Sequence, residues 1–247
     1  MTTITMHPAT LSRRPHRDAG RSADRRRDVG VPAIAHYTLP GRAYDLWVEG
    51  RLLEALGIPD DKRTRVEIVG GEIFVSPGPL FHHVKIATQI QKAFNRSENS
   101  NPEFLWQAVQ GMDFDLRHVG DGYIPDLIVM SNEEYDDPAN ESARNLVAEQ
   151  IAMVVEITSR STATNDRVPA ADAEHRTKWN GYAHEGVPFY LLVDRAPSVA
   201  RVSLFTDPYL PDGVYQTEKH WAFGETIVLP EPFRVEIPTD VWRPWQK

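Results

Sequence analysis

The sequence predicts an α/β or α+β fold, in which helices flank a mixed β-sheet core and an antiparallel extension follows at the C-terminal end. Residues 151–157 and 187–193 are runs of mostly apolar, often β-branched residues, typical of strands buried on both faces. Residues 80–94 have the apolar spacing of an amphipathic helix. From residue 201 to 242, Pro and Gly break the chain into short strands, which indicates the extension.

Composition limits the classes of protein that the chain can form. Its 247 residues suit one domain of moderate size with tails, and 41% hydrophobic residues can build a core. Cysteine is absent, which excludes disulfides, thiolate metal sites and a cysteine nucleophile. No apolar run approaches the ~18 residues needed to span a membrane, and the N-terminus lacks the apolar core of a signal peptide. We therefore expect a cytoplasmic protein with no membrane partner.

The charge is distributed unevenly. Residues 1–38 are rich in Arg, Asp, Ser and Pro, and we expect a disordered basic arm there, followed by a single domain over residues 39–247. Seven arginines and three aspartates give residues 1–30 a charge of +4. Because the net charge of the whole chain is −8, the remaining residues carry −12. The arm either touches nucleic acid or is a solvated extension. The acidic body argues against tight non-specific binding of DNA, though not against its hydrolysis.

The chain alternates predicted helices and strands. A helix over residues 43–56 is weakened at Gly50 and ends at Gly57. The Gly70-Gly71 pair indicates the turn of a hairpin over residues 65–77. The other expected elements are a helix at 80–94, strands at 104–109, 112–116, 123–130, 151–159 and 187–194, and a helix at 170–183.

Two of these strands carry a carboxylate where burial is expensive. Asp126 lies in the strand of residues 123–130, and Glu156 lies near the end of the strand of residues 151–159. An unpaired buried charge costs several kcal/mol or becomes neutral, so a metal cation or a lysine is expected nearby. Asp126 alone fits a strand-end turn equally well. Together the two acids predict a site for Mg²⁺ or Mn²⁺, which would polarise a phosphate and activate a bound water.

A lysine on the following predicted helix is the candidate cation. Lys178 could reach the end of the strand and stabilise developing negative charge, and Tyr182 shares its helix face. The alternative is a solvated lysine paired with Glu174, with Tyr182 in a packing role. Similarly, His83 lies on the apolar stripe of its helix, where histidine is more often a core or capping residue than a ligand.

Pro125-Asp126 followed by Glu156-Ile157-Thr158 resembles the PD-(D/E)XK nuclease motif. With the supporting stretches, about residues 42–235 resemble the Uma2 family of restriction-endonuclease-like proteins, also called DUF820. The stretches are residues 66–73, His83, 123–127, 154–159, 165–167, Lys178 with Tyr182, and 186–194. The resemblance implies a restriction-endonuclease-like fold and a metal-dependent endonuclease with DNA as its substrate. Cleavage of both strands would favour a homodimer.

The resemblance also implies roles for individual residues. Thr158 stands where the parent motif has a lysine, which implies that the lysine has migrated to Lys178. Glu67 would be the upstream acid, with Glu72 as its competitor. The implied catalytic residues are Asp126, Glu156, Lys178 and Glu67, the metal ligands are Asp126, Glu156 and Glu67, and the supporting residues are His83, Thr158, Asp166 and Tyr182. Asp166 could instead form a structural ion pair with Arg167.

Two functions follow from these observations. One is a metal-dependent endonuclease that acts on DNA by attack of water on a phosphodiester. The other is a non-catalytic protein of nuclease fold, serving as a binding or assembly module in a defence or mobile-element system. A zinc peptidase is disfavoured because the chain has no His-Glu-x-x-His pattern. Convergence of Asp126, Glu156 and Lys178 in space would favour the nuclease.

Overall fold

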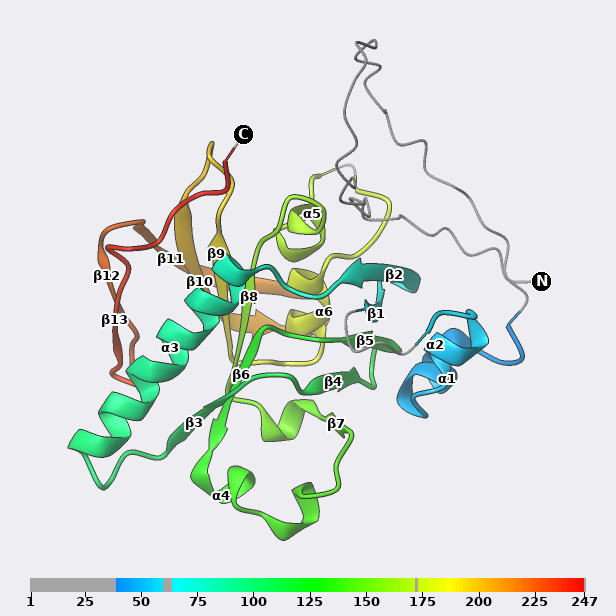
Figure 1. Ribbon diagram of the computed structural model, residues 1–247, viewed down its shortest axis with the longest axis horizontal. Coiled ribbons are helices and arrows are strands. Elements are labelled where there is room, and N and C mark those ends of the chain that lie inside the picture. The colour runs from blue at the N-terminus through cyan, green and yellow to red at the C-terminus, as the bar shows by residue number, and fades with distance from the viewer. Residues whose placement is uncertain (1–38, 60–63, 172, 247) are drawn as a thin grey trace, which may run out of the picture.

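The computed structural model describes residues 39–59, 64–171 and 173–246 (Figure 1). The expected basic arm, residues 1–38, lies outside the described residues. The described strands form sheets of five, six and two strands, and helices cover them. The mixed α and β architecture predicted from the sequence is confirmed. Within the described ranges, no helix combines the length and apolar character needed to cross a membrane.

The larger sheet has the strand order β11-β10-β9-β8-β6-β3. Its strands are β3 (Trp106–Val109), β6 (Leu127–Ser131), β8 (Met153–Ile157), β9 (Phe189–Asp194), β10 (Arg201–Tyr209) and β11 (Val214–Ala222). The pair β8 and β9 is parallel and the other neighbours are antiparallel, so the sheet is mixed, as predicted. The β10–β11 hairpin and the ribbon of β12 (Thr226–Val228) with β13 (Glu236–Pro238) form the expected antiparallel extension.

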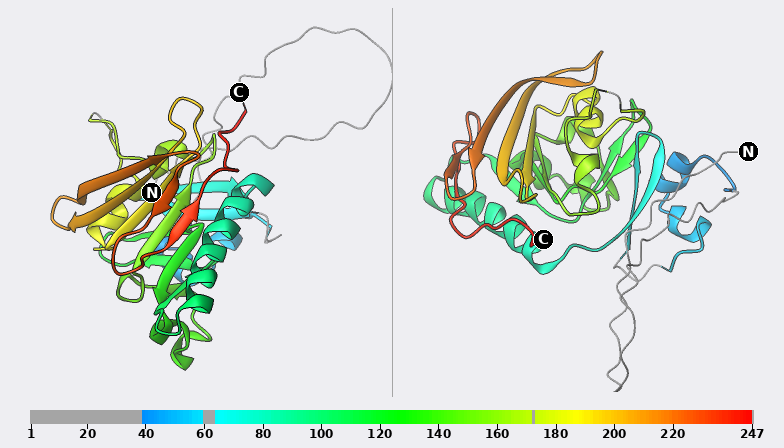
Figure 2. Two further views of the ribbon diagram at one scale, coloured as in Figure 1. Left: turned by 90° about the vertical axis from the view of Figure 1, so that its left-hand side faces the viewer. Right: turned by 90° about the horizontal axis from the view of Figure 1, so that it is seen from above.

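Strand β8 lies inside this sheet and is buried on both faces. Val155 packs in the same core cluster as α3 (Phe81–Ser100), whereas Val154 packs in the cluster that contains Tyr182 of α6 (Lys178–His184). Neighbouring strand residues point to opposite faces, so the two helices cover opposite sides of β8. Figure 2 shows α3 running along one face of the sheet. The burial predicted from the apolar run is confirmed.

The five-stranded sheet has the order β2-β1-β5-β4-β7. Its strands are β1 (Thr64–Val69), β2 (Glu72–Pro77), β4 (Asp113–Leu116), β5 (Asp121–Tyr123) and β7 (Asn145–Leu146). The predicted hairpin is confirmed as β1–β2. Gly70 and Gly71 both have positive φ, 61° and 82°, a conformation that a two-residue hairpin turn needs and that glycine adopts without strain.

The predicted strand over residues 123–130 is wrong, because the chain changes sheets within it. β5 ends at Tyr123 and β6 begins at Leu127. Pro125 cannot donate to a strand ladder, and the N–H of Ile124 donates instead to Oε1 of Glu67 at 2.8 Å. Asp126 therefore lies at the seam between the two sheets.

Two predicted helices also differ from the structure. The helix expected over residues 43–56 is split into α1 (Ala43–Val48) and α2 (Leu52–Ala55), because Gly50 adopts a φ of 71° between them. The helix expected over residues 170–183 begins only at Lys178, where Thr177 is the N-cap and its N–H donates to Oδ1 of Asn180. The remaining described helices are α4 (Asn132–Tyr135), α5 (Ala163–Asp166) and the 3₁₀ turns η1 (Pro138–Asn140) and η2 (Ala148–Gln150).

Candidate active site

A buried lysine lies among three carboxylates that come from separate elements. Nζ of Lys178 lies 2.6 Å from Oε1 of Glu67 on β1, 3.0 Å from Oε1 of Glu156 on β8 and 4.0 Å from Oδ1 of Asp166 on α5. Lys178 is 5% exposed. The alternative of a solvated lysine paired with Glu174 is therefore wrong. A charge buried this deeply needs partners of opposite sign, and the acids supply them.

Close packing of α6 brings Lys178 to this position. Tyr182 lies one helical turn after Lys178, and its hydroxyl donates to Oε1 of Glu156 at 2.6 Å. Gly181 lets the helix approach β5, since a Cβ atom there would lie 2.1 Å from the hydroxyl oxygen of Tyr123. Tyr123 and Tyr182 meet edge to face, with ring centroids 5.2 Å apart. The aromatic contacts hold the lysine face of α6 toward β8.

The protonation states of this cluster follow from burial and from the number of charges. Burial raises the pKa of Glu156 to about 7, although Lys178 opposes the shift. Burial likewise raises the pKa of Asp166 well above its ordinary value. Although burial disfavours the charged lysine, Glu156 and Glu67 hold the pKa of Lys178 above its usual range. A single ammonium group cannot balance three carboxylates, so the cluster favours either a bound proton or a further cation.

Asp126 has a different set of partners beside the same strand. Its Oδ2 accepts the N–H of Ile157 at 2.8 Å and lies 2.5 Å from Nε2 of His83, and its Oδ1 accepts from Arg65 at 3.3 Å. Burial alone would raise the pKa of Asp126, but His83 and Arg65 hold it below its ordinary value. Asp126 is therefore ionised under conditions in which Glu156 is partly protonated.

Sequence reasoning missed Arg65 as a member of this site. The residue lies on β1 two positions before Glu67, so the period-2 alternation of a strand places both side chains on the same face. That signal was present in the predicted hairpin. It could not identify Asp126 as the partner, because that contact joins residues 61 positions apart.

A pocket of about 210 Å³ lies beside Asp126. Arg65 and His83 line this pocket together with Asp126, and Gln110 lies on its wall. Guanidinium and imidazole N–H groups are common donors to phosphate oxygens. The pocket therefore places a guanidinium and an imidazole side chain beside the carboxylate.

Other residues named from the sequence have structural partners. The Thr158 hydroxyl accepts the N–H of Arg195 at 2.9 Å, which ties the end of β8 to the end of β9. The predicted ion pair between Asp166 and Arg167 is wrong, because Arg167 binds Asp194 with two contacts of 2.7 and 2.9 Å.

The structure also separates the two candidates for the upstream acid. Oε1 of Glu72 lies 3.3 Å from Nε2 of His175, whereas Glu67 lies against Lys178. Glu67 is therefore the one of the two that joins the cluster.

A divalent cation requires several oxygen donors that converge on one point. Within the described ranges, no group of three or more His, Asp or Glu residues is placed to hold a metal ion. Oε1 of Glu67 is already bound to Ile124 and Lys178. Oε1 of Glu156 is likewise bound to Lys178 and Tyr182, and the two oxygens of Asp126 are bound to Ile157, His83 and Arg65. A divalent cation at Asp126 and Glu156 would have to displace some of these contacts, and Mg²⁺ would keep several waters or phosphate oxygens as its other ligands.

The mixed sheet with helices on its faces agrees with the restriction-endonuclease-like fold that is expected from the sequence. The chain belongs to the Uma2 family, described as "Putative restriction endonuclease", whose family model matches residues 51–241. A crystal structure of "a putative nuclease belonging to DUF820" from Anabaena variabilis is similar over 72% of this chain and 88% of that chain, with 18% identity and a TM-score of 0.45. No curated protein matches the chain.

Proposed function

We propose that the protein is a metal-dependent endonuclease that hydrolyses phosphodiester bonds in DNA. The observation that carries this proposal is the convergence of Glu156, Lys178 and Glu67, with Lys178 Nζ 3.0 Å and 2.6 Å from the two glutamates. Asp126 is held beside them through Ile157. Membership of the Uma2 family supports a nuclease, and nucleic acid as the kind of substrate.

In this proposal each residue of the site has its own role. Asp126 and Glu156 would hold Mg²⁺ or Mn²⁺, which when bound supplies a polarised phosphate and a water of lowered pKa. Lys178 donates hydrogen bonds to the negative charge that develops on the phosphate oxygens. Glu67 acts as a positioning residue, because its contact with Lys178 fixes the ammonium group beside Glu156.

The residues around Asp126 have a separate task. His83 and Arg65 keep this carboxylate ionised, and both side chains line the pocket in which a phosphate would lie. These two residues would therefore affect both the proposed metal ligand Asp126 and the bound substrate. Cleavage of both strands of a duplex would require two such sites, so we also propose a homodimer, which light scattering after gel filtration would detect.

A plasmid-nicking assay tests the proposal. Supercoiled DNA is incubated with the protein in Mg²⁺, in Mn²⁺ and in EDTA, beside the variants Glu156→Ala and Glu236→Ala. Glu236 is an exposed carboxylate on β13 and serves as the matched control. We expect cleavage with either metal, none in EDTA, none for Glu156→Ala and the parent rate for Glu236→Ala. A protein that binds DNA but cleaves it under none of these conditions would instead be the non-catalytic module.

A further inference from the structure

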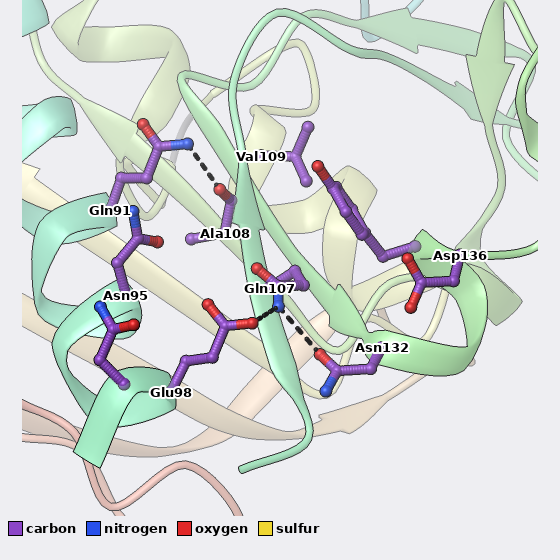
Figure 3. Close-up of a pocket in the computed structure, with 10 residues that line it drawn as sticks. Gln91, Asn95, Glu98, Gln107, Ala108, Val109, Asn132 and Asp136 are labelled. Atoms are coloured by element: carbon purple, nitrogen blue, oxygen red, sulfur yellow. Dashed lines mark hydrogen bonds between the residues drawn. The ribbon is translucent and has the colours of Figure 1, made fainter. Parts of the chain in front are cut away.

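A polar groove of about 460 Å³ lies between α3, β3 and α4 (Figure 3). Five amide side chains line it: Gln91, Asn95, Asn99, Gln107 and Asn132. Two carboxylates, Glu98 and Asp136, and the ring of Tyr135 complete its polar surface. Among the described residues that line the groove there is no lysine or arginine. The groove is therefore rich in hydrogen-bond donors and acceptors but offers no cation to a phosphate.

Hydrogen bonds fix the orientation of the central amide. Nε2 of Gln107 donates to Oε1 of Glu98 at 2.7 Å and to Oδ1 of Asn132 at 3.1 Å, while Nδ2 of Asn132 donates to the carbonyl of Phe104. An ionised carboxylate only accepts, so the nitrogen of Gln107 must face Glu98. Its Oε1 makes no hydrogen bond within the described part of the chain. It is an oriented, unused acceptor.

The groove is linked to the candidate active site along α3. Oε1 of Gln91 accepts from Nε2 of Gln110 at 2.8 Å, and Gln110 lines the pocket that contains Asp126. His83 contacts Asp126, and Gln91 follows it by eight residues on α3, which is ~12 Å along the axis at the rise of an α-helix. A strand whose phosphate lies at Asp126 can therefore place a neighbouring nucleotide at the groove.

The chemistry of the lining matches the edge of a nucleobase. Gln and Asn amides pair with the donor and acceptor of adenine, and Glu or Asp accepts from the amino group of cytosine. Tyr135 is 53% exposed and lines the groove, and an aromatic ring is the kind of group on which bases stack. We propose that this groove is a base-recognition subsite, which binds and selects a nucleobase close to the cleaved phosphate. The inference rests on the proposed nuclease function.

The shape of the groove indicates that the recognised base is unpaired. A protein reads duplex DNA by inserting a convex element into the DNA groove, whereas this site is a hollow on the protein. A base must leave the stack to enter such a hollow, as in sequence-specific recognition of single strands. The base that occupies the groove is therefore unpaired.

Addition of a peptide strand is disfavoured at the same place. β3 is an edge strand of the six-stranded sheet, and a free edge can pair with another chain. However, Nε2 of Gln91 donates to the carbonyl of Ala108 at 2.8 Å and so occupies the edge within the groove.

A binding assay tests the subsite without metal. Fluorescence anisotropy in EDTA compares a labelled single strand of mixed sequence, the same strand in a blunt duplex, and an abasic strand of equal length. We expect the natural single strand to bind roughly tenfold more tightly than the abasic strand, within the range for one stacked or hydrogen-bonded base. Equal affinity for the natural and abasic strands would overturn the inference.

Matched variants assign the effect to the groove. Gln107→Leu and Tyr135→Ala should each remove most of the preference for the natural strand. Gln216→Leu on β11, at the opposite edge of the same sheet, and Tyr209→Ala on β10 should keep it. Asn95→Ala, at an exposed position of α3, provides a second variant if Gln107→Leu does not fold. Loss of the preference in the control variants as well would contradict the assignment.

Sequencing of the cleaved ends in Mn²⁺ separates this inference from the proposed function. Cleavage with a base preference at a fixed distance from the cut, weakened by Gln107→Leu, supports both. Cleavage with a preference that Gln107→Leu leaves unchanged overturns the subsite alone. If the protein cleaves nothing but still prefers the natural strand through Gln107, the subsite stands and the nuclease proposal fails.

Discussion

Nζ of Lys178 lies 3.0 Å from Oε1 of Glu156, although the two residues belong to different elements, α6 and β8. The same oxygen accepts the hydroxyl of Tyr182 at 2.6 Å. The lysine is thus held at the end of the strand by a carboxylate that is itself fixed by a tyrosine. This arrangement gives direct expectations for variants of the site.

Replacement of Lys178 should affect chemistry more than metal binding. We expect Lys178→Ala to lose roughly 10²–10³-fold in cleavage rate, as when one donor to a developing anion is removed. Lys178→Arg should recover only part of the loss, because a planar guanidinium cannot replace a compact ammonium group. Single-turnover cleavage measures the rate, and calorimetry with Mn²⁺ serves as the control for binding. Cleavage by Lys178→Ala at the parent rate would remove the lysine from the mechanism.

The stability of the metal-free protein should depend on pH through Glu156. Its pKa is about 7 in the folded protein, against 4.5 as the ordinary value. Between these pH values the folded protein retains a proton that the unfolded chain has released. The contribution of Glu156 to the free energy of unfolding is therefore fully present below pH 4.5. It is lost as the pH rises toward 7, by an amount on the order of 3 kcal/mol.

Urea denaturation in EDTA across this window measures the effect, with Glu156→Gln as the non-titrating control. The difference in free energy of unfolding between the parent and the variant should decrease toward higher pH. Mn²⁺ binding to the parent should tighten over the same range, because the metal needs the ionised carboxylate. A difference independent of pH would show that Glu156 has an ordinary pKa.

Two variants of Asp126 should separate its structural contact from its role as a ligand. Asp126→Ala leaves the buried N–H of Ile157 without its acceptor, so the free energy of unfolding should fall by about 1–3 kcal/mol. Asp126→Asn keeps an acceptor oxygen and should recover most of the stability. Neither variant should bind Mn²⁺ at the parent affinity or cleave DNA. Thermal denaturation and calorimetry on both proteins measure these effects, and parent-like Mn²⁺ binding by Asp126→Asn would exclude Asp126 as a ligand.

Gly181→Ala should destabilise the protein although alanine is the better helix former. The gain in helix propensity is about 1 kcal/mol, but the new methyl group would lie 2.1 Å from the hydroxyl oxygen of Tyr123. Helix α6 must then move, and we expect a net loss of about 1–3 kcal/mol together with a lower cleavage rate, because Lys178 moves with the helix. Tyr123→Phe should relieve part of the loss, which a double-mutant cycle measures. Additive effects would show that the two residues do not collide.

The sequence could predict the strands of the site because their signal is local. The apolar run around Glu156 shows burial on both faces, and the two acids are exceptional within such runs. The break at Ile124 and Pro125 was missed because the residues on either side continue the apolar pattern. What divides them is the bond from Ile124 to Glu67, which joins residues 57 positions apart.

The partners of the charged residues could be predicted less well. The period of a helix or strand identifies a face but not what lies opposite it. Arg167 therefore suggested a pair with its neighbour Asp166, whereas the fold brings it to Asp194 at the end of β9. Likewise, the late start of α6 depends on the cap at Thr177, whose partner Asn180 lies inside the expected helix and gave no periodic signal.

Oε1 of Glu67 binds both Ile124, in the crossing between the sheets, and Lys178, on the helix packed behind β8. The residues of the cluster follow one another in the sequence in the order Glu67, Glu156, Asp166 and Lys178. During synthesis, the lysine that completes the group is therefore added last. For the proposed nuclease, a chain that ends before residue 178 lacks the lysine and should therefore not cleave.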